Sequence, residues 1–144
     1  NITRIGPADH PKVRLVGCLA QPEHLAFVRR PIIVVDLSPR VFVERVDHVT
    51  SFGFGDETRT RASLGYAGGG PSLVVTDCGV FDFTEEGRMR LRSLHSGVTV
   101  DDVRSRMSFE PDIADDLVET PSPMPSALRA IREEIDPSGS LLRV

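Results

Sequence analysis

Two stretches, Val74–Phe83 (VVTDCGVFDF) and Ser93–Val100 (SLHSGVTV), decide the fold of this 144-residue chain. The first stretch begins with β-branched, apolar residues that are typical of a buried strand, and it then alternates apolar with polar residues. Residues 88–94 alternate in the same way across a turn at residues 84–87. The pattern therefore predicts a β-hairpin with one face toward solvent.

Three segments near the start of the chain predict a strand, a helix and a second strand. Residues 12–17 alternate and stop at a glycine, residues 22–30 begin with proline and end with two arginines, and residues 32–37 are almost continuously apolar. Such an apolar run fits a parallel strand that is covered on both faces. The order predicts a βαβ unit with a right-handed crossover.

The remaining segments complete an α/β pattern. Residues 99–107 predict a helix with a capping box, and residues 126–135 predict a final amphipathic helix. Residues 110–125 are acidic and proline-rich, which predicts a surface connection, and residues 51–70 predict a long functional loop. Residues 41–49 fit either a strand or one or two helical turns. We expect one three-layer α/β domain over residues 1–144, with a mostly parallel, Rossmann-like sheet and a β-hairpin.

The composition narrows the class of partner. The formal net charge of −4 and the sequence pI near 5.5 give no electrostatic reason to expect nucleic acid or an anionic membrane. Apolar runs are far shorter than the roughly 20 residues of a transmembrane helix. Cys18 and Cys78 match no metal or redox spacing, which favours two reduced cysteines in a cytoplasmic protein over a disulfide.

No metal site is expected, because the four histidines lie in four separate segments. His95 precedes Gly97 and is expected to hold a turn through hydrogen bonds. The glycine-rich residues 65–71 precede a strand and do not open a helix, so they predict a plain turn or a close approach of the backbone to a neighbouring subunit, and not a phosphate loop. Asp77 could cap a turn or bind a ligand, and the sequence leaves both open. Asp82 is expected to lie on the solvent face of the hairpin.

One charged group is a candidate ligand site. Glu44, Arg45 and Asp47 lie close together in the sequence and are followed by Ser51. In a solvated loop such a group is ordinary. At the carboxyl end of an open α/β sheet it would line the crevice in which ligands bind. The sequence leaves both interpretations open.

The order of these pieces resembles a known family. The pattern VVTDxGVFDF followed by RLxSLHxGVTVxDV is similar to the C-terminal half of the second subunit of family I coenzyme A transferases, of the glutaconate CoA-transferase type. It also resembles their relatives that hydrolyse ring-containing acyl-CoAs in steroid breakdown. Further matching pieces are Val13-Arg14-Leu15, Phe42–Asp47, Gly69-Gly70-Pro71 and Ile131–Pro137.

The resemblance implies an enzyme subunit that acts on acyl-CoA. Family members move CoA between carboxylates through a glutamate that becomes a covalent thioester. That glutamate belongs to the N-terminal half of the subunit, so no residue of this chain is assigned as catalytic. The resemblance further implies a homologous first subunit as partner, in a heterodimer or heterotetramer. A coenzyme A thioester would be the substrate, with no permanently bound cofactor.

One departure from the family pattern bears on the chemistry. The family carries a glycine-rich run after the VRL strand, and here residues 17–21 keep only Gly17. Larger side chains hinder the approach of backbone N–H groups to a ligand. Gly17 is therefore a candidate ligand-binding residue in an altered turn. The departure speaks against ordinary transferase chemistry, and it is compatible with a diverged hydrolase-type relative or with a subunit that has lost catalysis.

Overall fold

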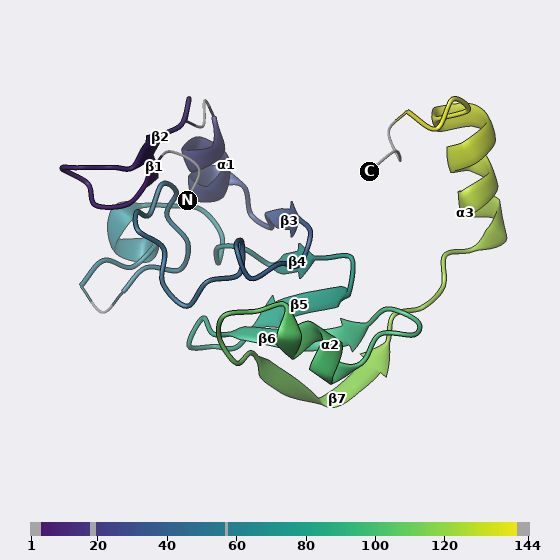
Figure 1. Ribbon diagram of the computed structural model, residues 1–144. Coiled ribbons are helices and arrows are strands. Elements are labelled where there is room, and N and C mark those ends of the chain that lie inside the picture. Colours follow the sequence, from purple (N-terminus) through teal and green to yellow (C-terminus); the bar gives the residue numbers. More distant parts are fainter. Residues whose placement is uncertain (1–3, 18–19, 57, 141–144) are drawn as a thin grey trace.

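The computed structural model describes residues 4–17, 20–56 and 58–140 (Figure 1). The helices and strands, in chain order, are β1 (Arg4–Ile5), β2 (Val13–Arg14), α1 (Gln21–Phe27), β3 (Ile32–Val34), the 3₁₀ helix η1 (Ala62–Leu64), β4 (Leu73–Val75), β5 (Gly79–Phe83), β6 (Met89–Leu94), α2 (Val100–Ser105), β7 (Asp112–Glu119), α3 (Pro125–Ala130) and the π-helical turn η2 (Ile131–Ile135).

A five-stranded sheet of order β3-β4-β5-β6-β7 forms the centre of the molecule. The outer pairs, β3 with β4 and β6 with β7, are parallel, whereas β4 with β5 and β5 with β6 are antiparallel. The α/β class with a hairpin is therefore confirmed. The sheet is mixed, with more antiparallel pairing than the sequence predicted, because the hairpin occupies its middle.

The predicted hairpin is β5 and β6, with Phe83 opposite Met89 at the turn. Phe81 and Leu91 face each other on its inner side and are fully buried. Asp82 lies on the opposite face, as the alternation predicts, but it is buried rather than solvated. Two arginines of β6 cover it, because Arg90 donates to both of its carboxylate oxygens at 2.9 Å and Arg92 donates at 3.3 Å.

Helix α2 lies against the inner face of the hairpin (Figure 1). Its N-terminus has the predicted capping box: the Thr99 hydroxyl accepts from the backbone N–H of Asp102, whose carboxylate accepts from the backbone N–H of Thr99. Val103 on this helix is fully buried. The core that it completes consists of Leu37, Phe42, Val74, Cys78, Phe81, Leu91, Val103 and Met107.

The predicted βαβ unit is wrong. Strand β2 does not join the central sheet and instead pairs antiparallel with β1, where Arg4 lies opposite Arg14. Gly6 makes the reversal possible with a φ of +94°, a conformation that favours glycine. The helix between β2 and β3 is present as predicted, with proline in its first turn.

Strand β3 is also not covered on both faces, which corrects a second prediction. It is an edge strand, and the side chains of Ile32 and Val34 are 57% and 78% exposed. The composition of this strand indicates burial, yet these two side chains remain largely exposed. Apolar residues on an open sheet edge are a surface for association.

The acidic segment 110–125 is not a simple connection, because strand β7 occupies residues 112–119. It pairs parallel to β6, with Ile113 opposite Leu91 and Val118 opposite Ser93. From the first pair to the second, β7 advances by five residues while β6 advances by two. The extra residues interrupt the alternation of apolar and polar side chains that marks a strand.

The long loop 51–70 is ordered around one arginine. Arg61 is buried and donates hydrogen bonds to five backbone carbonyls, at 2.8 to 3.2 Å; these belong to Leu25, Ala26, Gly53, Ala67 and Gly68. The loop is thereby tied to the end of α1. Residues 41–49, which fitted either a strand or a helix, form turns and neither of the two.

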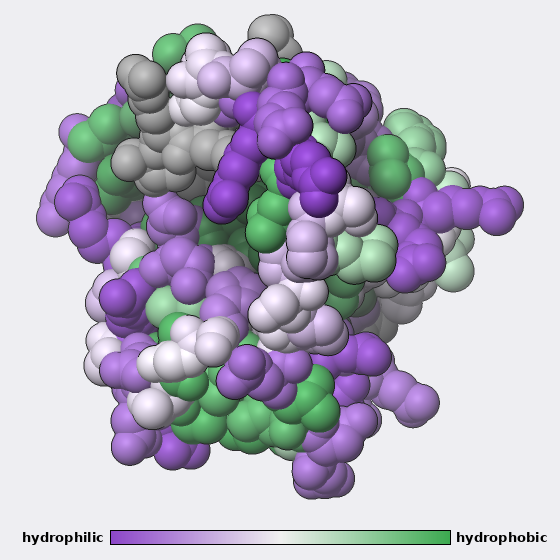
Figure 2. All heavy atoms as spheres, turned by 90° about the vertical axis from the view of Figure 1, so that its right-hand side faces the viewer, coloured by the Kyte–Doolittle hydropathy of each residue, from purple (hydrophilic) through white to green (hydrophobic). Residues whose placement is uncertain are grey.

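Helix α3 and η2 extend away from the sheet, at the opposite side of the molecule from β1 and β2 (Figure 1). The predicted final helix is confirmed, and Asp136 ends it by accepting from the backbone N–H of Ser140. On this side of the molecule apolar side chains are exposed among polar ones (Figure 2). Met124, which precedes α3, and Ile135 of η2 have exposed side chains. Within the described residues, no helix is long and apolar enough to cross a membrane.

Candidate functional site

Two cavities adjoin each other around the β1–β2 hairpin. The larger has a volume of about 730 Å³, and the smaller about 300 Å³. Leu15, which follows β2, lines both of them. Neighbouring side chains of a strand point to opposite faces, and in β1 Arg4 accordingly lines the smaller cavity whereas Ile5 lines the larger one.

The larger cavity combines an apolar wall with a few charges. Strand β3 and the residue that follows it form part of the wall, and Val41, Val43 and Val46 form another. Arg40, Arg45 and Asp47 also line this cavity. A mostly apolar hollow with a small number of polar groups is the common form of a small-molecule site.

The structure brings together two of the five predicted site residues. Arg45 and Asp47 line the larger cavity, whereas Glu44 is exposed and does not line it. Gly17, three residues after β2, has a φ of +94°, a backbone conformation that favours glycine, whereas residues 18 and 19 of the predicted altered turn lie outside the described residues. Ser51 lies apart from both cavities, with a buried hydroxyl that has no hydrogen-bond partner among the described residues.

Asp47 holds the hairpin against the segment that carries it. Its carboxylate accepts a hydrogen bond of 2.9 Å from the backbone N–H of Gly6, at the reversal between β1 and β2. This bond fixes the position of the next residue, His48, relative to β1. Asp47 therefore has a structural contact in addition to its place in the cavity wall.

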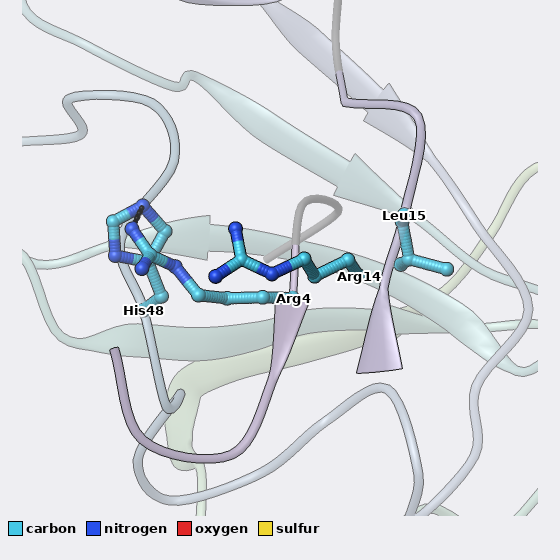
Figure 3. Close-up of a pocket in the computed structure, with 4 residues that line it drawn as sticks. All are labelled: Arg4, Arg14, Leu15 and His48. Atoms are coloured by element: carbon cyan, nitrogen blue, oxygen red, sulfur yellow. Dashed lines mark hydrogen bonds between the residues drawn. The ribbon is translucent and has the colours of Figure 1, made fainter. Parts of the chain in front are cut away.

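The smaller cavity is basic (Figure 3). Arg4 and Arg14 extend from neighbouring strands in the same direction, toward His48, while Leu15 points the other way. The Nη2 atom of Arg4 is 3.2 Å from Nε2 of His48, and Nη1 donates to the carbonyl of Ala8 at 3.0 Å. A guanidinium has no acceptor, so Nε2 of His48 accepts this bond and its proton resides on Nδ1.

Two polar residues of the family-like stretch are structural: His95 as predicted, and Asp77 through contacts with distant segments and not as a turn cap. Asp77 accepts from the backbone N–H of Leu37 at 2.7 Å and from Arg106 at 2.6 Å. The hydrogen bond from the Leu37 backbone, then that from its own backbone and that from Arg106, hold the pKa of the Asp77 carboxyl below its usual range. His95 holds its turn, with Nε2 2.9 Å from the carbonyl of Thr76.

The glycine-rich residues 65–71 are also structural. A Cβ atom on Gly68 would lie 2.7 Å from the carbonyl oxygen of Arg29, so the backbone approaches the end of α1 too closely for any side chain. The close approach is therefore made to the same chain, and not to a neighbouring subunit as one of the two predicted alternatives had it. No group of three histidine, cysteine or carboxylate side chains within the described ranges could hold a metal ion.

Sequence reasoning missed the two arginines and the histidine of the smaller cavity. The sequence marks Arg14 only as part of a family-like piece, and β1, which carries Arg4, is too short to produce an alternating pattern. The separation of 44 residues between Arg4 and His48 leaves no local signal. Their proximity follows from the reversal at Gly6 and its bond to Asp47.

Comparison with known proteins gives a consistent set of relatives. The chain is similar to the second subunit of glutaconate CoA-transferase from Acidaminococcus fermentans, with 36% identity over 100% of this chain and 54% of the relative. It is also similar to the cholesterol ring-cleaving hydrolase IpdB subunit from Mycobacterium tuberculosis, with 34% identity over 95% of this chain and 54% of the relative. No protein-family model matches the chain.

The fold agrees with these relatives. The crystal structure of glutaconate CoA-transferase from Acidaminococcus fermentans superimposes with a TM-score of 0.81 and 34% identity, over 100% of this chain and 55% of that one. The chain therefore spans about half the length of the relatives that it matches.

Proposed function

Because the chain belongs to the family of coenzyme A transferase second subunits and their hydrolase relatives, we propose that it is part of an enzyme that transfers CoA between carboxylates. A homologous first subunit is the proposed partner, in a heterodimer or heterotetramer. A CoA thioester is the substrate, and no cofactor is permanently bound. The chain is proposed to be the C-terminal, CoA-transferase-like part of a longer subunit.

One observation carries this proposal. The similarity to the second subunit of glutaconate CoA-transferase extends over the whole chain, in sequence and in fold. Agreement over short motifs would fit many α/β domains, whereas agreement over 100% of the chain at a TM-score of 0.81 supports a shared subunit architecture. Fold alone does not imply function, so the activity needs its own test.

The larger cavity is the proposed place where this chain contacts the substrate. Its apolar wall suits the uncharged body of an acyl-CoA, and Arg45 and Asp47 supply polar contacts at its margin. Gly17 lies in the turn two residues after Leu15 and is proposed to present backbone there. Glu44 and Ser51, which do not line the cavity, have at most an indirect role.

The thioester-forming glutamate of the proposed mechanism is assigned to no residue of this chain. The contribution of this chain is to bind and orient the substrate, while the nucleophile comes from elsewhere in the complex. In the transfer reaction the glutamate carboxylate attacks the thioester carbonyl, and CoA leaves as thiolate from the mixed anhydride that forms. The thiolate attacks the glutamyl carbonyl of this anhydride, which gives the enzyme thioester and releases the donor acid. The same two steps in reverse, with a second acid, deliver CoA to that acid.

Hydrolysis of a ring-containing acyl-CoA is the second candidate. The similarity to the IpdB subunit favours it, and so does the loss of glycines after Gly17, which departs from the transferase pattern. A non-catalytic subunit that stabilises an active partner is the third candidate, and it rests on the same altered turn. We place the protein in the cytoplasm, because the described Cys78 is a free, buried thiol.

The deciding experiment uses the full-length subunit co-expressed with its first subunit. Free CoA and the CoA thioester of the acceptor are both measured, with and without an acceptor acid. Transfer predicts formation of the acceptor's CoA thioester without net release of CoA, and a thioester on the enzyme that borohydride traps. Hydrolysis predicts release without the acceptor. Absence of both reactions with every acyl-CoA tried would contradict an enzymatic role.

The third candidate has its own test in the same complex. Substituting glycine for Cys18 and Leu19 restores the family's glycine-rich run. A purely structural subunit predicts unchanged activity of the complex after this double substitution. A large increase in activity would contradict that role and would place this turn next to the reacting group.

A further inference from the structure

We infer that the smaller cavity, lined by Arg4, Arg14 and His48, binds an anionic oxygen group of the ligand, a phosphate or a carboxylate. The inference rests on the proposed function for the identity of the ligand, but the basic site itself is argued from the geometry alone. It adds a binding site to the apolar cavity that lies beside it.

The first step of the argument is the cross-strand pair. Arg4 and Arg14 are directly opposite each other in a hairpin of two residues per strand. Like charges in such positions destabilise a strand pair, and a hairpin of this length has little stability of its own. Both side chains nevertheless extend in the same direction into the cavity (Figure 3).

The second step is the absence of a compensating carboxylate at Arg14. No ion pair joins Arg14 to an acidic side chain within the part of the chain that the structure describes. Asp47, which is next to His48 in the sequence, lines the other cavity and binds the backbone of Gly6. The charge of Arg14 is therefore directed at the cavity.

The third step is the arrangement of donors. His48 accepts from Arg4 through Nε2 and keeps a proton on Nδ1, so the histidine orients the Arg4 guanidinium. Two guanidinium groups converging on one hollow match the geometry with which arginine binds carboxylate and phosphate oxygens. Leu15 connects this hollow to the apolar cavity, so a ligand with an apolar body and an anionic end would span both.

Arg14→Gln is the better test, because Arg4 also holds the carbonyl of Ala8. The assembled full-length complex is titrated calorimetrically with CoA, 3′-dephospho-CoA, glutarate and pyrophosphate. We expect Arg14→Gln to weaken at least one of these probes by about tenfold or more. Arg14→Lys should retain part of the affinity, and Arg129→Gln, on exposed helix α3, should bind as wild type.

The probes separate the two sources of the anion. A loss for CoA that exceeds the loss for dephospho-CoA assigns the site to a phosphate of the coenzyme, and a loss for glutarate assigns it to a carboxylate of the acyl group. Wild-type affinity of Arg14→Gln for all four probes would overturn the site while leaving the proposed function intact. Binding of pyrophosphate that depends on Arg14, in a complex that binds no CoA, would support the site and contradict the proposed function.

Discussion

Two regions of this molecule, the central sheet and the N-terminal segment, are built differently. In residues 73–119, strands β4–β7 and helix α2 surround a core in which Phe81, Leu91 and Val103 are fully buried. In residues 4–56, only Ala26, Leu37 and Phe42 belong to the buried hydrophobic core among the residues that the structure describes, and many other apolar side chains are half exposed.

This difference in burial shows that different interactions hold the two regions together. The sheet region is stabilised by packing, which tolerates little change in shape. The N-terminal region is held by polar side chains that bind the backbone: Arg61 across loop 51–70, Asp47 at Gly6 and Asp77 at Leu37. Its apolar residues line cavities or remain exposed. It therefore offers the surfaces on which a ligand or a partner can bind.

The largest expected effect on stability comes from truncating a leucine in the sheet region, and the same truncation in the N-terminal region is its control. Leu91→Ala removes a fully buried side chain and should lower the free energy of unfolding by about 2–5 kcal/mol. Leu15→Ala, where the side chain is 48% exposed, should lower it by less than about 1 kcal/mol. Urea unfolding of the full-length subunit measures both. Equal losses would show that the rest of the subunit covers Leu15 and would break the comparison.

Removal of Arg61 should be the next largest effect. Arg61→Met leaves several backbone carbonyls without their donor and should cost about 2–3 kcal/mol. Hydrogen exchange should show the loss mainly in residues 51–70 and α1. Arg59→Met, two residues away and exposed, is the matched control and should change stability by less than about 0.5 kcal/mol. Faster exchange throughout β5 and β6 as well would contradict the view that Arg61 stabilises the N-terminal region separately from the sheet.

The smallest effect concerns the buried carboxylate of the hairpin. The hydrogen bonds from Arg90, and then Arg92, hold the pKa of Asp82 below its usual value of 3.8. A lowered folded-state pKa contributes stability above that value and loses it as the pH falls through the folded-state pKa. Asp82→Asn should therefore cost about 1 kcal/mol at pH 7 and progressively less below pH 3.8.

Unfolding midpoints of wild type and Asp82→Asn, measured from pH 7 down to pH 3, check this dependence. A difference that stays constant over the range would mean that the ion pairs contribute nothing to stability. The sheet region would then be held by packing alone, which sharpens the contrast with the N-terminal region.

The predictions from the sequence succeeded where structure is local. The hairpin, the capping box at Thr99, the strand β4 and the final helix each follow from residues that are close in the sequence. Strand β7 was missed because three extra residues interrupt its alternation. The prediction of a βαβ unit was wrong because strand pairing depends on tertiary contacts: the reversal at Gly6 brings β2 next to β1, and the two pair with each other.

The residues of the candidate site also fall into those that a local pattern predicted and those that only the fold brings together. Arg45 and Asp47 were predicted from a local cluster of charge, and they do line the larger cavity. Arg4, Arg14 and His48 come from three separate segments, and no periodicity links them.

By itself, the sequence determined the family-like hairpin, the capped helix and the α/β class, because hydrophobic period and capping residues act over a few neighbouring positions. Only the tertiary structure decided that β2 pairs outside the central sheet, that Asp82 is buried beneath two arginines, and that Arg4 and Arg14 line one cavity with His48. Each of these depends on contacts between residues far apart in the chain, where the free energy of packing and pairing outweighs local preference.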